Sequence, residues 1–325
     1  MHHHPIPVRI ITVVGFCLLA TLSHGSRIKA EGPLVILATA DNVLPNDRVL
    51  VTWNDIADDK AKDGDSERAL LDTISTDQKA ESAPLKKKLP MPGEVFHVAE
   101  RPAFVIPPDE KSSDGATPWV WYAPTFPNLP GTEELWMFER FTKAGIAIAG
   151  IDVGESYGNP DGRKLFSAFY RELTEKRGFA PKPVLLGRSR GGLMTLGWAV
   201  ENADKVGGFA GIYPVCNIAS YPGVPQASGA YRLKPDELAA QLAEHNPIDR
   251  LAALAKAKVP LFAIHGDVDK VVPLEANSGE VRKRYQALGG EMQLIVPAGQ
   301  GHNMWSGFFQ CQELVDFVIA NAKAN

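Results

Sequence analysis

Apolar and polar positions divide the chain into two parts that meet near residue 92. Residues 54–88 are polar and rich in charge, with few side chains able to fill a core. We interpret them as a linker or a loosely attached segment with one helical stretch around residues 67–75. Beyond residue 92, short apolar runs alternate with longer amphipathic ones, as expected of a folded domain.

The alternation predicts a series of strands and helices. Residues 94–108 are expected to form a hairpin or an edge pair. Apolar strands are expected within residues 118–126, 146–153, 182–189, 206–215, 259–267 and 291–299. Helices are expected within residues 133–145, 163–178, 190–203, 273–290 and 304–321. Because strands separated by single helices need crossover connections, this order predicts an α/β fold with a mostly parallel, doubly wound sheet.

One segment interrupts this alternation. Residues 217–246 are rich in Gly and Pro and carry a helical pattern of their own, which predicts a small cap insertion. In open α/β sheets, ligands bind at the carboxyl ends of the strands. We therefore expect the functional residues on the loops that follow the strands, with the cap over them.

The N-terminus predicts export. The apolar run Ile10–Leu22 follows Arg9 and is too short to span a bilayer comfortably. Its length is typical of the apolar region of a cleavable signal peptide, and small residues offer cleavage after Gly25 or after Ala30. An uncleaved membrane anchor is the alternative.

These features divide the chain into three parts. We assign residues 1–30 to a signal peptide, residues 31–92 to a polar N-terminal segment, and residues 93–325 to an α/β domain with the cap insertion. A secreted or periplasmic protein is expected, with no stable membrane insertion once the leader is removed.

The composition excludes several function classes. Hydrophobic residues make up 45% of the 325 residues and charged residues 22%, as in ordinary globular proteins. A formal net charge of -4 and the lack of a long basic run argue against nucleic acid as a partner. Beyond the leader only Cys216 and Cys311 remain, and the sequence leaves open whether they form a disulfide. No HExxH motif or Cys/His cluster is present, so neither metal nor cofactor is expected.

A serine in a glycine frame is the strongest chemical signal. Residues Gly187–Gly191 read GRSRG, which has the form GxSxG, and stand between a predicted strand and a predicted helix. A nucleophilic serine needs this context because a sharp turn lifts its hydroxyl clear of the sheet while glycines let the neighbouring backbone pass closely. We predict that Ser189 is a nucleophile, and a purely structural turn is the alternative.

A serine hydroxyl needs a base, and four histidines follow the leader. His97 lies far upstream, His245 is expected to help end a helix, and His265 lies within a predicted strand, where a structural role is expected. His302 follows the last predicted strand on a glycine-rich loop, from which it can reach Ser189. We predict that His302 is the base.

A third residue must orient that histidine, and further groups must hold the oxyanion. Asp267 and Asp269 both follow the preceding predicted strand, and their positions leave the choice open. The chain order Ser, Asp, His is that of α/β-hydrolases. The oxyanion hole is expected to combine the backbone N–H of Arg190 with a donor from Thr125 or Phe126, after the first buried strand.

These motifs resemble those of a known family. The segments GRSRGG, HGDVDKVVP, GQGHN, PWVWY and PVCNIASYPG are similar to exported bacterial α/β-hydrolases of the prolyl-oligopeptidase-like (dienelactone-hydrolase-like) serine hydrolase group. The resemblance covers residues 93–325, implies the α/β-hydrolase fold, and supports Ser189 and His302 in their roles. In the family pattern HGxxDxxVP the acid falls on Asp269. Relatives often carry Asp where this chain has Asn217, so the resemblance says less about substrate than about mechanism.

The two arginines beside the serine bear on the substrate. Glucuronoyl esterases resemble this chain in having Arg directly after the nucleophile, which implies that the Arg190 side chain helps to hold the oxyanion. The alternative is that both arginines are helix-start residues that face solvent or an acid. Arg188, Glu155, Tyr213 and Trp305 are the candidates for substrate contact, and core packing is the alternative for the aromatic ones.

The sequence therefore predicts an exported serine hydrolase that cleaves a carboxylic ester, an acyl or uronate ester on a carbohydrate, through an acyl-enzyme. A prolyl-oligopeptidase-type serine peptidase is the first alternative, although the roughly 60 residues after the leader are too few for a β-propeller. A non-catalytic binding protein on the same fold is the second. The expected partner is a small-molecule or oligosaccharide ester, and the oligomeric state stays open.

Overall fold

The computed structural model describes residues 87–110 and 115–324 in full and the backbone of four short strands nearer the N-terminus. Those strands, β1 (Arg9–Ile11), β2 (Leu18–Thr21), β3 (Val43–Leu44) and β4 (Arg48–Val51), form an antiparallel sheet of order β1-β2-β4-β3. The remainder of the proposed signal peptide and the helix expected around residues 67–75 lie outside the described residues. The chain divides into two compact units, residues 1–81 and 82–325, and the second carries the predicted site.

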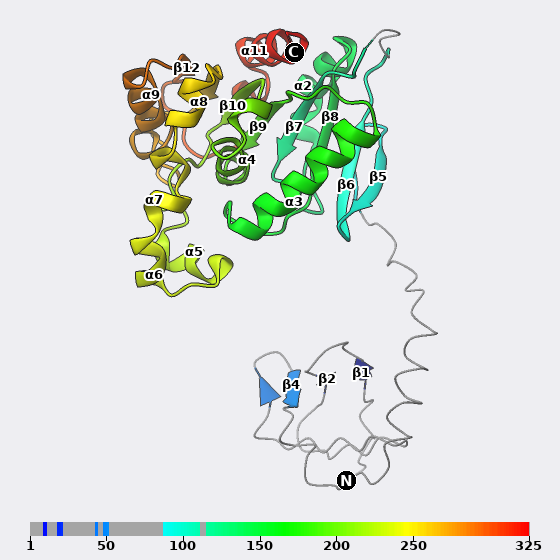
Figure 1. Cartoon of the computed structure of the whole chain (residues 1–325), viewed down its shortest axis with the longest axis vertical. Coiled ribbons are helices and arrows are strands. Elements are labelled where there is room, and N and C mark those ends of the chain that lie inside the picture. Colours follow the sequence, from blue (N-terminus) through cyan, green and yellow to red (C-terminus); the bar gives the residue numbers. More distant parts are fainter. Residues whose placement is uncertain are drawn as a thin grey trace, which may run out of the picture. The chain divides into compact units, whose positions relative to one another are not determined.

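An eight-stranded sheet forms the centre of the second unit (Figure 1). Its strands are β5 (Glu94–Val98), β6 (Arg101–Ile106), β7 (Trp119–Ala123), β8 (Ala147–Ile151), β9 (Val184–Arg188), β10 (Gly208–Ile212), β11 (Leu261–Ile264) and β12 (Met292–Ile295). Their order is β12-β11-β10-β9-β7-β8-β6-β5, with β7 to β12 mutually parallel and β6 antiparallel to its neighbours β5 and β8. The predicted mostly parallel sheet is confirmed. The predicted hairpin is β5–β6, with a two-residue turn at Ala99 and Glu100 that both adopt positive φ.

Helices cover both faces of this sheet (Figure 1). One face carries α3 (Pro160–Arg171), the π-helical η4 (Glu172–Lys176), α4 (Gly191–Ala199), α8 (Ala252–Lys256) and α9 (Ser278–Ala287). The other carries α2 (Leu135–Lys143), α10 (Ser306–Phe309) and α11 (Gln312–Lys323). Short 3-10 turns are η3 (Thr132–Glu134), η5 (Ala203–Lys205), η6 (Pro247–Asp249) and η7 (Leu274–Ala276). The single helix expected at residues 304–321 is in fact two, because the backbone at Cys311 is extended.

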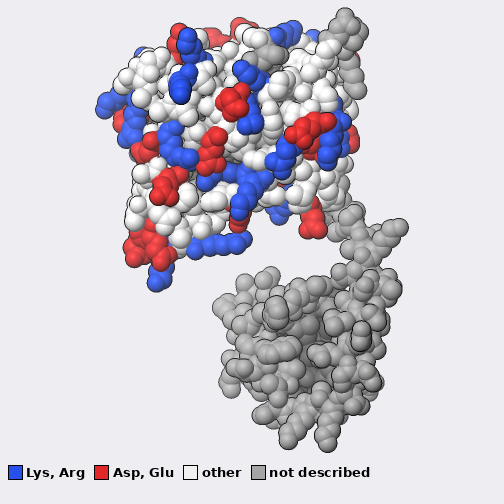
Figure 2. Space-filling model, in the orientation of Figure 1, with Lys and Arg blue, Asp and Glu red and all other residues white. Residues whose placement is uncertain are grey.

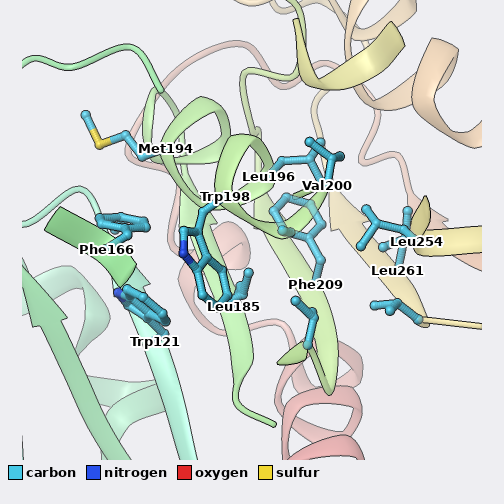
Figure 3. Close-up of a cluster of buried hydrophobic side chains, with 14 of the residues drawn as sticks. Trp121, Phe166, Leu185, Met194, Leu196, Trp198, Val200, Phe209, Leu254 and Leu261 are labelled. Carbon is cyan, nitrogen blue, oxygen red and sulfur yellow. The ribbon is translucent and has the colours of Figure 1, made fainter. Parts of the chain in front are cut away.

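The strands build the core by alternation. Along β7, Trp119 and Trp121 face α3 and α4, whereas Val120 and Tyr122 face α2 and α11. The Trp121 ring lies 4.7 Å from that of Phe166 and 4.9 Å from that of Trp198, measured between centroids. Figure 3 shows these rings filling the space between the sheet and α4. Truncating a buried aromatic of this kind to Ala costs about 3–5 kcal/mol, so this layer supports the position of α4.

The cap leaves the sheet after β10. It consists of α5 (Val224–Tyr231), α6 (Pro235–Ala240) and α7 (Leu242–His245), so His245 ends a helix as predicted. The cap has a small core of its own, which it shares with Tyr157, Leu193 and Val272 from the sheet domain. It is therefore anchored on α4 and on the loops that follow β8 and β11.

Acidic and basic side chains are interspersed on the face of the second unit shown in Figure 2. No helix within the described residues is long and apolar enough to cross a membrane. Cys216 and Cys311 are both buried free thiols, which answers the question of a bridge between them. Burial raises the pKa of Cys311 to about 11, so this thiol stays protonated at neutral pH.

Candidate active site

Ser189 lies in a tight turn between β9 and α4. Its φ is +49°, in the left-handed region that residues other than glycine seldom adopt. Its N–H donates to the Ile212 carbonyl at 3.0 Å, and its carbonyl accepts from the N–H groups of Gly192 at 2.9 Å and Val215 at 2.8 Å. Such strain costs about 1–3 kcal/mol and persists where the surroundings impose it. Here three backbone hydrogen bonds impose it.

Two glycines make this turn possible because the backbone passes too close for side chains. A Cβ at Gly191 would lie 2.1 Å from the carbonyl oxygen of Ala123, and one at Gly192 would lie 2.4 Å from that of Val215. The start of α4 therefore packs directly on the end of β7 and on the loop after β10. This is the close approach that a GxSxG turn requires.

The structure brings Ser189, His302 and Asp269 together in one hydrogen-bonded chain. The Ser189 Oγ lies 2.9 Å from His302 Nε2, and His302 Nδ1 lies 2.8 Å from Asp269 Oδ2. An ionised carboxylate can only accept, so the imidazole carries its proton on Nδ1 and presents the Nε2 lone pair to the hydroxyl. The three residues follow β9, β12 and β11, at the carboxyl edge of the sheet.

Asp269 is held ionised and in place by its neighbours. Its Oδ1 accepts from the N–H groups of Val271 at 2.9 Å and Val272 at 2.8 Å, and its Oδ2 also lies 3.4 Å from His265 Nε2. Burial alone would raise the pKa of this carboxyl, but the hydrogen bonds from His265, Val272 and His302 outweigh it and lower the pKa to about 2. The carboxylate is therefore charged at neutral pH.

Burial lowers the pKa of His302, and its contact with Asp269 offsets this only in part. The imidazole is thus neutral near pH 7, as a general base must be. The ring of Tyr213, a predicted substrate contact, lies 4.4 Å from the imidazole and is 2% exposed. Tyr213 therefore supports the histidine from within the core. Trp305, another predicted substrate contact, is 41% exposed.

The two remaining residues of this region have structural contacts. His265 is fully buried, with Nδ1 2.8 Å from Ser278 Oγ and Nε2 2.8 Å from the Val272 carbonyl oxygen. Both ring nitrogens are satisfied, in line with the predicted structural role. Asp267 accepts from the N–H of Gly299 at 2.7 Å and so fastens the loop that carries His302.

Arg188 is part of a buried polar cluster. Its Nη1 lies 2.7 Å from Glu134 Oε1, and the two side chains are 13% and 0% exposed. Glu134 also accepts from the Tyr122 hydroxyl at 2.7 Å and from the Gly131 N–H at 2.8 Å. Burial by itself would lower the pKa of Arg188, but Tyr122 and Glu134 raise it, so the guanidinium stays charged. The structure thus gives Arg188 an acid partner of its own inside the domain.

Arg190 and Glu155, both predicted site residues, form an ion pair. Their side chains are 37% and 34% exposed, and the Arg190 guanidinium carbon lies 5.5 Å from the centroid of the Phe126 ring. The arginine therefore lies against the loop after β7 and keeps contact with solvent. The sequence gives no indication that Arg190 and Glu155 form this pair.

Lys87 was missed by sequence reasoning. Its Nζ donates to three carbonyls of the loop after β7, those of Thr125 at 3.1 Å, Phe126 at 3.0 Å and Leu129 at 2.7 Å. Burial lowers the pKa of Lys87 to about 8, although the charge of Asp152 opposes this. Lys87 thus holds the loop with the candidate oxyanion donors in place, although it belongs to residues 31–92, which the sequence predicts to be a polar segment or linker. One lysine in a charge-dense run carries no signal for such a role.

One family model matches the part of the chain that carries the hydrogen-bonded residues from Ser189 to Asp269. Residues 166–320, a little under half of the chain, match the model of the prolyl oligopeptidase family, Peptidase_S9. The matched region contains Ser189, Asp269 and His302. No curated protein matched the sequence.

Solved structures show the same fold. Puromycin hydrolase is 18% identical, with a TM-score of 0.54, over 72% of this chain and 39% of its own. MPT51 from Mycobacterium tuberculosis is 17% identical, with a TM-score of 0.56, over 71% of this chain and 98% of its own. Est1E from Butyrivibrio proteoclasticus is 16% identical, with a TM-score of 0.53, over 72% of this chain and 100% of its own. The chain thus spans about two fifths of puromycin hydrolase, and these likenesses concern the fold.

The predicted fold class is confirmed by the mostly parallel eight-stranded sheet and by these neighbours. The family match over residues 166–320 supports a serine hydrolase and leaves the choice between ester and peptide open. The second unit therefore has the α/β-hydrolase fold, and its residues 166–320 match the prolyl oligopeptidase family.

Proposed function

We propose that this protein is a serine hydrolase that cleaves a carboxylic ester, an acyl or uronate ester on a carbohydrate, through an acyl-enzyme. The observation that carries the proposal is the hydrogen-bonded chain from Ser189 through His302 to Asp269. It starts from a serine in a strained turn and stands at the carboxyl edge of a parallel sheet, where such folds bind ligands.

The first half-reaction transfers the acyl group to the enzyme. Ser189 Oγ attacks the ester carbonyl carbon while His302 Nε2 takes the hydroxyl proton, and a tetrahedral oxyanion forms. The bond to the departing alcohol then breaks, and His302 gives its proton to that oxygen. Asp269 stays ionised and stabilises the imidazolium between these two transfers.

The second half-reaction releases the acid. Water attacks the acyl-Ser189 ester while His302 again takes a proton, and the bond from the carbonyl carbon to Oγ breaks as the proton returns to Oγ. The carboxylic acid leaves, and the free serine is restored.

The oxyanion needs donors in both half-reactions. We propose the backbone N–H of Arg190, at the start of α4, together with a donor from Thr125 or Phe126. The hydrogen bonds from Lys87 to the Thr125 and Phe126 carbonyls support a fixed position for this loop. The Arg190 guanidinium is engaged by Glu155, so the backbone group is the donor in this proposal.

A second candidate function is peptide hydrolysis, which the match to the prolyl oligopeptidase family favours. Neighbours whose names include the word peptidase, such as a puromycin-hydrolyzing peptidase of Mycobacterium tuberculosis, are in line with this alternative. The two neighbours whose own chains are covered almost completely, MPT51 and Est1E, have no such word in their names. We retain export through the signal peptide at residues 1–30 as part of the proposal.

A fluorophosphonate probe tests the nucleophile. One label per chain is expected on Ser189, because the probe reacts with a serine whose proton is taken by a positioned base. Ser189→Ala should abolish labelling, and Ser167→Ala, on α3, should keep it. Labelling at another residue would contradict the assignment, and no labelling at all would favour a non-catalytic binding protein.

The ester preference is tested with two chromogenic substrates. The protein should turn over p-nitrophenyl acetate faster than a proline p-nitroanilide, and Ser189→Ala should lose both activities. Faster turnover of the anilide would establish the peptidase alternative.

A further inference from the structure

A groove of about 370 Å³ lies between the start of α2 and α10. Residues that line it include Glu133, Leu135, Trp136, Glu139, Met304 and Phe309. None of them belongs to the hydrogen-bonded chain that starts at Ser189, and the proposed mechanism does not use them.

The groove is continuous with the groups that support the triad. Met304 Sδ lies 3.1 Å from Arg188 Nη2, and the Phe309 ring centroid lies 5.0 Å from the Arg188 guanidinium carbon. The ring of Tyr213 contacts that of His302 at 4.4 Å and that of Phe309 at 6.3 Å, measured between centroids. Two side chains that line the groove, Met304 and Phe309, thus pack on Arg188 and Tyr213, and Tyr213 in turn contacts the base.

The chemistry of the base places the departing alcohol on this side. His302 Nε2 must deliver a proton to the departing oxygen, so that oxygen leaves Ser189 on the side of the imidazole. Met304 follows His302 by two residues and is 48% exposed. The groove, which Met304 lines, therefore begins within two residues of the group that protonates the departing alcohol.

The charges of the lining select the kind of alcohol. Within residues 87–110 and 115–324, the carboxylates of Glu133 and Glu139 form no ion pair, so they disfavour an anionic group beside them. The guanidinium of Arg140 already lies 3.4 Å from the centroid of the Trp136 ring, which weakens the attraction of that ring for a second cation. Hydroxyl groups can donate to both carboxylates while a C–H face packs on Trp136 and Leu135.

We propose that this groove is the subsite for the alcohol part of the ester and that it takes a neutral, hydroxyl-rich group such as a sugar ring. The inference rests on the proposed function and names the residues that recognise the alcohol. Trp136 supplies the packing surface, and Glu133 and Glu139 supply the hydrogen-bond acceptors.

A set of acetate esters with one acyl group and different alcohols tests the subsite. The substrates are 6-O-acetylglucose, p-nitrophenyl acetate, cationic acetylcholine and anionic acetylsalicylate. We expect Glu139→Ala and Trp136→Leu each to lower kcat/KM for 6-O-acetylglucose about tenfold relative to p-nitrophenyl acetate, the effect of losing one good contact. Glu175→Ala removes the same charge from η4 and should leave that ratio unchanged.

The outcomes separate this inference from the proposed function. An unchanged ratio in both groove variants would overturn the subsite even if p-nitrophenyl acetate is hydrolysed, and so would a larger loss on acetylcholine than on the sugar ester. If the wild-type protein hydrolyses none of the esters, the proposed function fails. Saturation-transfer NMR then decides on the groove: 6-O-acetylglucose should bind Ser189→Ala protein, and the signal should disappear when Trp136→Leu is added. A signal that persists in that double variant would also overturn the subsite.

Discussion

The ion pair between Arg188 and Glu134 is buried close to the nucleophile, because Arg188 directly precedes Ser189 in the chain. The two side chains are 13% and 0% exposed, and the carboxylate accepts hydrogen bonds from Arg188, the Tyr122 hydroxyl and the Gly131 N–H. Removing one partner of such a pair leaves the other charge buried and uncompensated, which costs about 3–5 kcal/mol. We therefore expect Glu134→Leu and Arg188→Met each to lower the free energy of unfolding substantially.

The contacts of each side chain set the size of its effect. Glu134→Leu also leaves the Tyr122 hydroxyl and the Gly131 N–H without an acceptor. We therefore expect it to lower the free energy of unfolding by ~5 kcal/mol. Arg188→Met leaves Glu134 with two hydrogen-bond donors, so we expect it to lower the free energy of unfolding by only ~3 kcal/mol. Both single variants break the same ion pair. The double variant should therefore lose at least ~2 kcal/mol less free energy of unfolding than the two single variants lose together.

Urea unfolding of the full chain, followed by tryptophan fluorescence, measures these free energies. Lys176→Met serves as the control, because Lys176 pairs with Glu172 at the surface with 69% of its side chain exposed, and such pairs contribute about 0.5 kcal/mol or less. If Arg188→Met left stability within ~0.5 kcal/mol of the wild type and instead raised KM, the reasoning would be refuted and Arg188 would be a substrate contact.

Two further predictions concern the triad. Asp269→Asn should lower kcat on the ester substrate about 10⁴-fold with unchanged circular dichroism, because the amide favours the wrong imidazole tautomer; a loss of less than tenfold would exclude Asp269 as the orienting acid. Burial lowers the pKa of His302 from 6.5, and only the neutral imidazole can act as base, so kcat/KM should rise with pH through a midpoint below 6.5 and be lost on the acid side. A midpoint above 7 in the pH profile would contradict this.

The elements that the sequence predicts well are those with a local cause. The parallel strands are short runs of apolar residues because both faces of the sheet are covered, and β7 is buried at every position. The hairpin β5–β6 and the positions of α2 and α3 likewise follow from periodicity within each segment, whereas α4, which is buried on every side, follows from the GxSxG motif before it. The break between α10 and α11 was not predicted, because the apolar pattern continues across Cys311 while the backbone there is extended.

In the candidate site, too, the sequence located residues with a local signal and missed contacts between distant segments. Ser189 and His302 could be located because each follows a recognisable strand, and the choice of Asp269 over Asp267 came from the family resemblance. The contacts of the charged residues around them could not be predicted from the sequence. Glu134 lies 54 residues from Arg188 in the chain, and Lys87 lies 38 residues from Thr125, so no local pattern links either pair.

The sequence by itself determined the order of strands and helices, the sheet edge at which chemistry collects, and the three residues that meet there. These depend on periodicity and on short motifs, which act over a few residues. Only the tertiary structure decided that Arg188 is paired within the domain, that Arg190 is paired with Glu155, and that Met304 lines a groove with residues from the start of α2. Such features depend on which side chains packing brings together from distant segments, and no single segment specifies that.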